Sequence, residues 1–232
     1  MEKYKKCIQK AAQVIKNSEA LLLGISNGLS IAEGYNIFAN NEMFQEQFSQ
    51  FQKRYGIHSV LQGIFHDYPD EASRQDFFRT LILNWITRYR PSPQMLDLRE
   101  LVGNKDYFVV TSNGDTHLEL TGFDPLKVFE IEGTFITAAK NEAPVDRNSQ
   151  LHEFIAKHQN NNVTFLEIGI GKFNRLIKPF MANLACKLEC ARYLTFNLPG
   201  EISLPESIGN AATAVPGDLT DTLRDVVRAL QE

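Results

Sequence analysis

The chain has 232 residues, of which 43% are hydrophobic, 10% aromatic and 22% charged, values close to the averages for a globular protein. This composition excludes a collagen, a long coiled coil and extensive disorder, and the length suffices to bury a sizeable core. Lys and Arg number 24 against 28 Asp and Glu, so the net charge of −4 disfavours a nucleic-acid partner.

Neither a targeting segment nor a membrane span is expected. Residues 1–10 (MEKYKKCIQK) are charged, and every apolar run is far shorter than the roughly 18 residues needed to cross a bilayer. The three cysteines, Cys7, Cys186 and Cys190, do not form an even disulfide framework. We therefore expect a cytoplasmic protein in a reducing compartment, without a membrane partner.

The first elements along the chain are a helix and a strand. Apolar residues recur with helical spacing from Tyr4 to Ile15, and Asn17 and Ser18 interrupt the pattern. The short apolar run at residues 20–25 (ALLLGI) predicts a buried strand, because its length and flanking glycines favour a strand over a buried helix.

Residues 36–90 are interpreted as a helical insertion. Aromatic and apolar side chains form two stripes with helical spacing, the first of Phe44, Phe48, Phe51 and Tyr55, the second of Phe77, Leu81, Trp85 and Tyr89. The second stripe stops before Pro91. Such stripes are typical of core packing, so we assign this insertion no chemistry.

Four later apolar runs predict further strands, at residues 107–110, 128–131, 163–168 and 193–197. Helical patterns stand between most of them, and Asp218 caps a last helix. Alternating strands and helices favour parallel pairing through right-handed crossovers. The predicted fold class is α/β: one domain over residues 1–232, with a Rossmann-like parallel sheet, helices on both faces and the small helical insertion.

In an open parallel sheet, ligands bind beyond the carboxyl ends of the strands. Residues 24–30 (GISNGLS) form a small-residue turn into a helix, which either holds a phosphate group or allows close packing. Residues 111–115 (TSNGD) and 168–171 (IGIG) follow strands and are either ligand contacts or turns with a helix cap. Glu130 and Glu132 fall on the same side of a predicted strand, and Glu132 lies at its end, so Glu132 is either a ligand contact or a surface carboxylate.

The order and types of these segments resemble the sirtuin family of NAD-consuming deacylases and ADP-ribosyltransferases. Residues 26–34 match the second Gly, first Ser and last Gly of the sirtuin GAG-x-S-x-x-S-G turn, and Thr111, Asn113, Asp115 and Gly122 match T-Q-N-x-D with the following A-G. The similarity is fuller with the class M sirtuins, the bacterial branch linked to macrodomain proteins, over five segments: residues 24–30, 51–56, 107–115, 120–124 and 165–171.

The resemblance implies that NAD is the cofactor and that the nicotinamide glycosidic bond is cleaved. It implies catalytic roles for Asn113, Asp115 and Glu132. It implies cofactor contacts along the edge of the sheet by Gly24, Ser26, Asn27, Gly28, Ser30, Gly34, Ser112, Asn113, Asp115, Gly169, Gly171, Asn197 and Asp218. Because such cleavage passes through a cation-like ribose carbon, the site must hold the ribose and place oxygens where positive charge develops.

The sequence also departs from the family pattern. Glu132-Gly133 stands where most sirtuins have a catalytic His before Gly and class M members tend to have Gln, and Ser26 replaces the first Gly of the turn. Cys186 and Cys190 fall at i, i+4 on a predicted helix, far in sequence from Cys7, so we expect no zinc. Residues 132–150 are interpreted as a reduced remnant of the zinc-module region, with a loop over residues 134–148.

Two functional hypotheses follow. The first is a sirtuin-like NAD-dependent protein ADP-ribosyltransferase, or a deacylase, for which the resemblance implies a lipoyl-carrier protein and a macrodomain protein as partners. The second is a catalytically degenerate module that binds NAD or ADP-ribose as a sensor, which Ser26 and Glu132 motivate. A third reading, a partner-binding protein built on the aromatic insertion, is disfavoured because core burial explains that insertion.

Overall fold

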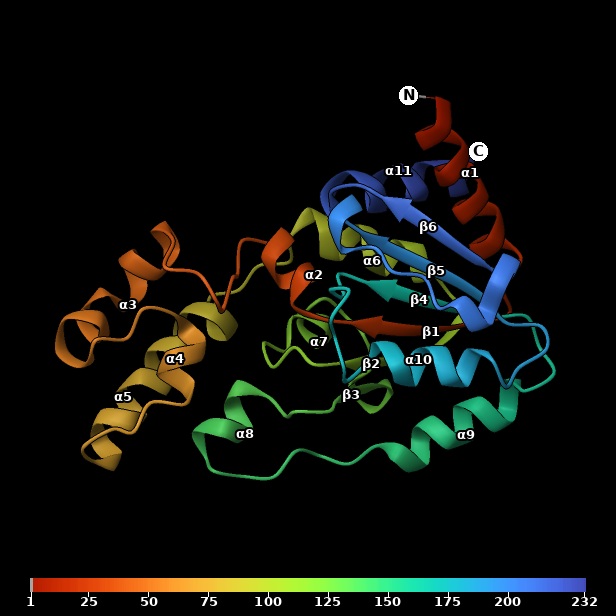
Figure 1. The fold of residues 1–232 in the computed structure, drawn as a ribbon. Helices are drawn as coiled ribbons and strands as arrows, with labels where there is room; N and C mark the ends of the chain where they lie inside the picture. The colour runs from red at the N-terminus through yellow and green to blue at the C-terminus, as the bar shows by residue number, and fades with distance from the viewer. Residues whose placement is uncertain (1) are drawn as a thin grey trace.

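The computed structural model describes residues 2–232, which form a parallel sheet of six strands in the order β3-β2-β1-β4-β5-β6 (Figure 1). The strands are β1 (Ala20–Ile25), β2 (Asp106–Thr111), β3 (Val128–Glu130), β4 (Val163–Ile168), β5 (Arg192–Asn197) and β6 (Ala212–Pro216). The predicted α/β fold class is therefore confirmed. Strand β6 was not predicted, because Val215 is its single buried residue and the run lacks an apolar pattern.

Helices cover both faces of the sheet (Figure 1). One face carries α1 (Glu2–Lys16), α6 (Pro93–Val102) and α11 (Leu219–Gln231); the other carries α9 (Asn148–His158) and α10 (Lys178–Ala185). Short helices follow the strands or lie in the loops: α2 (Asn27–Ala32), α7 (His117–Leu120), α8 (Phe135–Ala139), η2 (Pro125–Lys127), η3 (Pro199–Glu201) and η4 (Glu206–Ala211).

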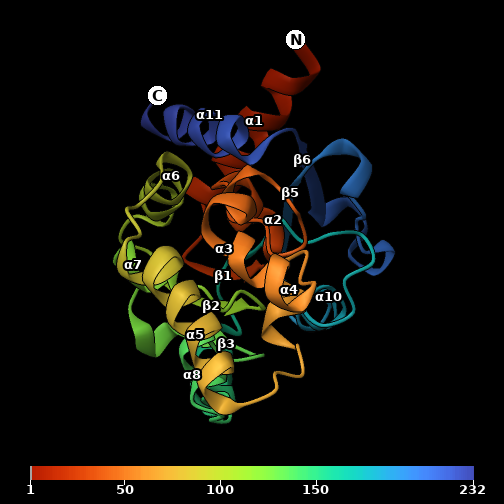
Figure 2. The ribbon, with the colours of Figure 1, turned by 90° about the vertical axis from the view of Figure 1, so that its left-hand side faces the viewer.

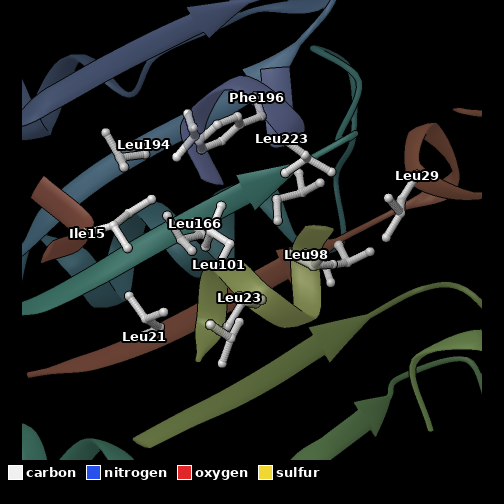
Figure 3. Close-up of a cluster of buried hydrophobic side chains, with 14 of the residues drawn as sticks. Ile15, Leu21, Leu23, Leu29, Leu98, Leu101, Leu166, Leu194, Phe196 and Leu223 are labelled. Carbon is white, nitrogen blue, oxygen red and sulfur yellow. The ribbon is translucent and has the colours of Figure 1, made fainter. Parts of the chain in front are cut away.

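The central strands are apolar throughout because both of their faces are buried. Leu21 and Leu23 of β1 pack under α1, α6 and α11, whereas Leu22 packs under α9 and α10. Figure 3 shows the first of these clusters, where Leu23, Leu166 and Leu194 of neighbouring strands meet side chains of the covering helices. This core fixes the relative height of the strand ends, where the polar turns begin.

A helical segment lies beyond the carboxyl ends of the strands and stands in front of them in Figure 2. It comprises α3 (Glu42–Tyr55), α4 (Val60–Ile64), α5 (Glu71–Ile82) and the π-helix η1 (Leu83–Thr87). The side chains of Asn41, Ser59 and Asp70 cap its α-helices. Its aromatic stripes form a separate core, to which α8 adds Phe135 and Ala139.

The structure corrects three local predictions. Cys186 and Cys190 do not share a helix face, because α10 ends at Ala185; both are exposed free thiols. The region 134–148 is not simply a loop, because a capping box at Thr134 starts α8 there. Strand β3 ends at Glu130, so Glu132 lies beyond the strand in a turn.

Among residues 2–232, no three or more His, Cys, Asp or Glu side chains are grouped closely enough to hold a metal ion. None of the helices that the structure describes combines the length and the apolar character needed to cross a membrane.

Candidate functional site

Two neighbouring cavities lie along the carboxyl ends of the strands, where the sequence predicted a ligand site. Cavity A has a volume of about 510 Å³ and lies beyond β1, β4 and β5; its lining is Ser26, Asn27, Gly28, Ile31, Ala32, Phe38, Gly169, Gly171, Asn174, Asn197, Leu198, Glu201, Asp218 and Leu219. Cavity B has a volume of about 320 Å³ and lies beyond β1 and β2; its lining is Asn27, Ile37, Phe38, Leu61, Ile64, Phe65, Ser112, Asn113, Gly114, Asp115, Glu132, Gly133, Thr134, Phe135 and Ala138. Asn27 and Phe38 border both cavities.

The floor of cavity A depends on a close approach of two backbones. The N–H of Gly28 donates to the carbonyl oxygen of Gly169 at 3.0 Å. A Cβ atom on Gly28 would lie 2.5 Å from the Cα of Gly169, and Gly169 itself has φ +63°. Both positions therefore require glycine. The N–H of Leu29 bonds to Ser26, so the start of α2 leaves fewer free donors than the sequence pattern suggested.

The charged groups that line cavity A are acidic. Glu201 and Asp218 contribute carboxylates, and no Lys or Arg among residues 2–232 lines this cavity. Asp218 caps α11 by accepting from the N–H of Thr220 at 2.8 Å. The amide of Asn197 donates to the carbonyl oxygen of Ile170 at 2.9 Å, which ties the end of β5 to the loop after β4.

The polar wall of cavity B is a buried network centred on Asn113. The Nδ2 of Asn113 donates to the carbonyl oxygen of Ser26 at 3.3 Å and to the hydroxyl of Ser30 at 2.9 Å. Ser30 in turn donates to Asp115 at 2.5 Å. Since Asn113 directs its nitrogen to two acceptors, its Oδ1 is the free end of the side chain, and this buried oxygen has no hydrogen-bond partner.

Behind Asp115 lies a buried histidine, His117, on α7. Its Nδ1 is 3.1 Å from the Oε2 of Glu33, and its Nε2 is 2.7 Å from the carbonyl oxygen of Trp85. Burial alone would lower the pKa of His117, but the charge of Asp115 and the hydrogen bond to Glu33 outweigh burial and place this pKa above its ordinary value.

Glu119 is an acid on the same helix as His117. Burial, followed by the neighbouring carboxyl group of Glu130, raises the pKa of Glu119 to about 8. Glu119 does not line either cavity, whereas Glu132 is exposed at the mouth of cavity B.

The structure gathers most of the residues singled out in the sequence around the two cavities. Those that line cavity A are Ser26, Asn27, Gly28, Gly169, Gly171, Asn197 and Asp218. Those that line cavity B are Asn27, Ser112, Asn113, Asp115 and Glu132. Ser30 supports Asp115 and Asn113 from behind. Gly24 and Gly34 line neither cavity: a Cβ on Gly24 would meet Ile177 and Met181, so that glycine allows α10 to pack closely.

Sequence reasoning missed several lining residues. The helical segment, which was assigned no chemistry, places Leu61, Ile64 and Phe65 in the wall of cavity B, and α8 adds Phe135. An exposed fraction of 80% for Phe65 marks it as a surface residue, but no spacing in the sequence distinguishes it from core aromatics. Asn174 and Glu201 reach cavity A from loops whose course the sequence does not specify.

Comparisons with known proteins identify a curated relative and solved structures of similar fold. The sequence is 24% identical over 275 residues to a protein of Staphylococcus aureus strain Mu50 named protein ADP-ribosyltransferase, covering 92% of this chain and 85% of that protein. No protein-family model matches the chain.

Three solved structures of Sir2 proteins resemble the whole chain. One, concerned with the mechanism and regulation of Sir2 enzymes, has a TM-score of 0.58 at 16% identity and covers 97% of this chain and 98% of its own. A Sir2 homologue in complex with NAD has a TM-score of 0.57 at 12% identity, covering 96% and 93%. A structure concerned with sirtuin substrate affinity has a TM-score of 0.58 at 15% identity, covering 94% and 96%. At these identities the matches show the fold, and the resemblance to sirtuins is confirmed at that level.

Proposed function

We propose that this chain, which has the fold of the Sir2 enzymes, binds NAD along cavities A and B and acts as a protein ADP-ribosyltransferase. The single observation that carries the proposal is Asn113: it is 6% exposed, its amide nitrogen is fixed by Ser26 and Ser30, and its oxygen lacks a partner at the wall of cavity B. A buried unsatisfied oxygen in a cavity wall is the feature that a bound ligand donor would complete.

The residues present fit a dinucleotide. Cavity A offers Asn197 and Asp218 to the adenosine half, and Ser26 and Asn27 to the diphosphate, while Gly28 and Gly169 keep the two loops close. Cavity B offers Asn113 and Asp115 to the nicotinamide ribose. Each cavity falls within the roughly 300–1,000 Å³ usual for ligand sites.

NAD supplies a nicotinamide glycosidic bond whose cleavage generates positive charge at the ribose carbon. The chain's own contribution is electrostatic and positional. Asp115, 5% exposed, brings a carboxylate to the wall of cavity B, and Ser30 and the N–H of His117 hold its two oxygens in place. Preorganised charge of this kind stabilises developing positive charge without reorganising during the reaction.

Glu132 stands at the mouth of cavity B, where we propose that it accepts a hydrogen bond from a ribose hydroxyl or takes up its proton. Because Glu132 is exposed, we expect Glu132→Gln to lower nicotinamide release only about tenfold and to flatten the pH profile. An unchanged rate and pH profile would show that Glu132 transfers no proton. We propose that apolar residues of α4 and α8, which line cavity B together with Glu132, contact the acceptor protein, and that this acceptor is a lipoyl-carrier protein working with a macrodomain protein.

Two observations favour a second candidate, a module that binds NAD or ADP-ribose without turnover. The N–H groups of Gly28 and Leu29 are bonded within the protein, and Glu132 lies outside the strand on which its placement was predicted. The same module would use cavities A and B for binding alone.

Calorimetric titration with NAD and with ADP-ribose, followed by a nicotinamide-release assay, tests both candidates. The release assay uses lipoyl-carrier proteins and acyl-lysine peptides as acceptors. Nicotinamide release with modification of a carrier protein supports the transferase; release with deacylation of the peptides supports the deacylase. Binding without release supports the module. If the protein binds neither NAD nor ADP-ribose, all of these proposals are wrong.

A further inference from the structure

The strongest unassigned feature is a pair of buried ionisable side chains, Glu33 and His117, behind the lining of cavity B. The Glu33 side chain is 1% exposed and that of His117 is 2% exposed. The Oε1 of Glu33 accepts hydrogen bonds from the hydroxyl groups of Tyr89 and Ser92, each at 2.7 Å. Its Oε2 faces the Nδ1 of His117 at 3.1 Å. Every oxygen of Glu33 is thus engaged, as a buried carboxylate requires.

The surroundings of His117 define its protonation. Its Nδ1 faces the carboxylate of Glu33 and its Nε2 faces the carbonyl oxygen of Trp85 at 2.7 Å. With Glu33 ionised, its carboxylate and the carbonyl oxygen of Trp85 can only accept, so both ring nitrogens donate and the ring is an imidazolium. The direction of the pKa of His117, above its ordinary value, agrees with this geometry.

The carbonyl oxygen of Trp85 is available because of the π-helix. In η1 the N–H of Arg88 donates to Leu83, five residues back, and the N–H of Tyr89 donates to Ile86. The carbonyl oxygen of Trp85 is therefore bypassed by the helix and accepts from His117 instead. This bond ties the helical segment to the loop after β2.

The other titratable groups that face His117 come from each element packed around it. The Oδ2 of Asp115, from the same loop, is 3.9 Å from Nδ1. The ring of Tyr89 stacks on the imidazole with centroids 3.7 Å apart, and the ring of Tyr35 meets it edge-on at 4.7 Å. The carboxylates of Glu33 and Asp115 favour the charged ring, whereas the two phenol rings of Tyr35 and Tyr89 pack against it without a charge of their own.

A chain of hydrogen bonds leads from His117 to the wall of cavity B. The backbone N–H of His117 donates to the Oδ1 of Asp115 at 3.1 Å, and the hydroxyl of Ser30 donates to its Oδ2. That hydroxyl can accept only from the Nδ2 of Asn113, at 2.9 Å. The direction of every bond is fixed, and the chain ends at the free Oδ1 of Asn113.

We propose that His117 and Glu33 form a positioning pair, in which the buried imidazolium joins α2, the helical segment and the loop after β2, and thereby keeps Asp115, Ser30 and Asn113 in the arrangement that leaves the Asn113 oxygen free. Neither residue touches a ligand in this scheme. The pair deepens the proposed function, on which its consequence for NAD affinity rests, but the arrangement itself exists in the free protein.

The pair makes the site dependent on pH. When His117 loses its Nδ1 proton, Nδ1 and the Oε2 of Glu33 are both hydrogen-bond acceptors, 3.1 Å apart. Without a proton between them they repel, and we expect the two side chains to separate. Because the folded-state pKa is raised, the arrangement is complete at lower pH and is lost as pH rises through that pKa.

The first test needs no ligand. Nuclear magnetic resonance of the free protein, labelled at histidine and asparagine nitrogens, follows the ring of His117 and the side-chain amide of Asn113 during a pH titration. We expect both ring nitrogens to carry protons at neutral pH, and the Asn113 amide to shift with the midpoint of His117. A singly protonated ring at neutral pH, or an Asn113 amide that ignores the titration of His117, overturns the proposal.

The second test measures NAD affinity by calorimetry across the same pH range. We expect His117→Gln to weaken binding about tenfold, the scale on which outer-shell partners affect a site, and to abolish the loss of affinity at high pH. The double variant Glu33→Gln/His117→Gln restores a neutral hydrogen-bonded pair and part of the affinity, still without the pH dependence.

His158→Gln is the matched control, because His158 is also buried but binds Asp106 at the opposite end of β2. It should keep the wild-type pH profile. Wild-type affinity and pH profile in His117→Gln overturn the positioning pair. Wild-type protein that does not bind NAD refutes the proposed function, and the resonance titration then decides the pair by itself.

Discussion

Cavities A and B meet at Asn27 and Phe38 but are built in different ways. Cavity A is built on a backbone contact between Gly28 and Gly169. Of its two carboxylate residues, Glu201 is half-buried and Asp218 is exposed. Cavity B rests on side chains that bond one another out of solvent, with Asn113 and Asp115 almost fully buried. The backbone contact in cavity A holds the two loops at a fixed separation, whereas the buried hydrogen bonds in cavity B hold polar side chains in fixed orientations. Within the proposed function, we therefore assign selection and binding of the ligand to cavity A and the chemical step to cavity B.

The largest expected effect comes from Asn113→Ala, which removes the free oxygen of cavity B. Nicotinamide release should fall by at least about 100-fold in kcat, the usual loss for one preorganised polar group. Asn197→Ala is the matched variant in cavity A, where the amide ties two loops. It should raise KM about tenfold with a small change in kcat. Steady-state kinetics of nicotinamide release separates the two, and equal effects of both variants on kcat and KM would break the comparison.

Gly169→Ala tests whether the cradle of cavity A is as rigid as its contacts indicate. The new Cβ would lie 2.5 Å from the N of Leu29 and 2.7 Å from the C of Gly28, at a residue with φ +63°. Because these are backbone atoms, the new Cβ can be accommodated only if the two loops move apart. We therefore expect a loss of about 2 kcal/mol or more in unfolding free energy, together with loss of NAD binding. Thermal unfolding and calorimetry measure both quantities.

Gly171→Ala is the control for that substitution, since its Cβ would meet only the Oε2 of Glu201, at 3.3 Å, on a flexible side chain. Its unfolding free energy should stay within about 0.5 kcal/mol of wild type. Equal unfolding temperatures for the two alanine variants would show that the loops of Gly28 and Gly169 can separate at little cost.

Glu201→Gln probes what cavity A selects. Glu201 accepts from the N–H of Lys172 at 3.3 Å, and with Asp218 it gives the cavity two carboxylates. If the adenosine half of NAD lies here, a 2′-phosphate would meet like charge, and the protein should prefer NAD to NADP. We expect Glu201→Gln to raise NADP affinity about tenfold with little change for NAD. Asp218→Asn keeps the helix cap and should change the ratio less; an unchanged NADP affinity in Glu201→Gln would place the ribose elsewhere.

The contrast between the cavities also separates what the sequence can predict from what it cannot. Asn113 and Gly169 were identifiable because apolar runs reveal strands, and the carboxyl ends of parallel strands share one edge. Glu33 and His117 were not, because they lie 84 residues apart, at the end of α2 and in α7, and no periodic pattern shows that these two short helices are neighbours. Glu201 was missed for a similar reason: the loop after β5 carries it back to cavity A.

The smallest expected effect concerns stability on the side of cavity B. Burial and the neighbouring carboxyl group of Glu130 raise the pKa of Glu119 from 4.5 to about 8. Between these values the folded protein keeps a proton that the unfolded chain releases, so the free energy of unfolding falls as pH rises and levels off above about 8. Glu119→Gln replaces the protonated acid with a permanent donor and removes this decline.

We therefore expect Glu119→Gln to unfold about 2–4 °C above wild type at pH 8.5, corresponding to about 1 kcal/mol, and to show little difference near pH 4.5. Thermal unfolding scans at several pH values measure the effect. Glu201→Gln supplies the control, because it removes a half-buried carboxylate from the other cavity. If Glu119→Gln follows the wild-type dependence on pH, Glu119 is ionised in the folded protein, and the buried polar groups near cavity B are confined to the network of Asn113.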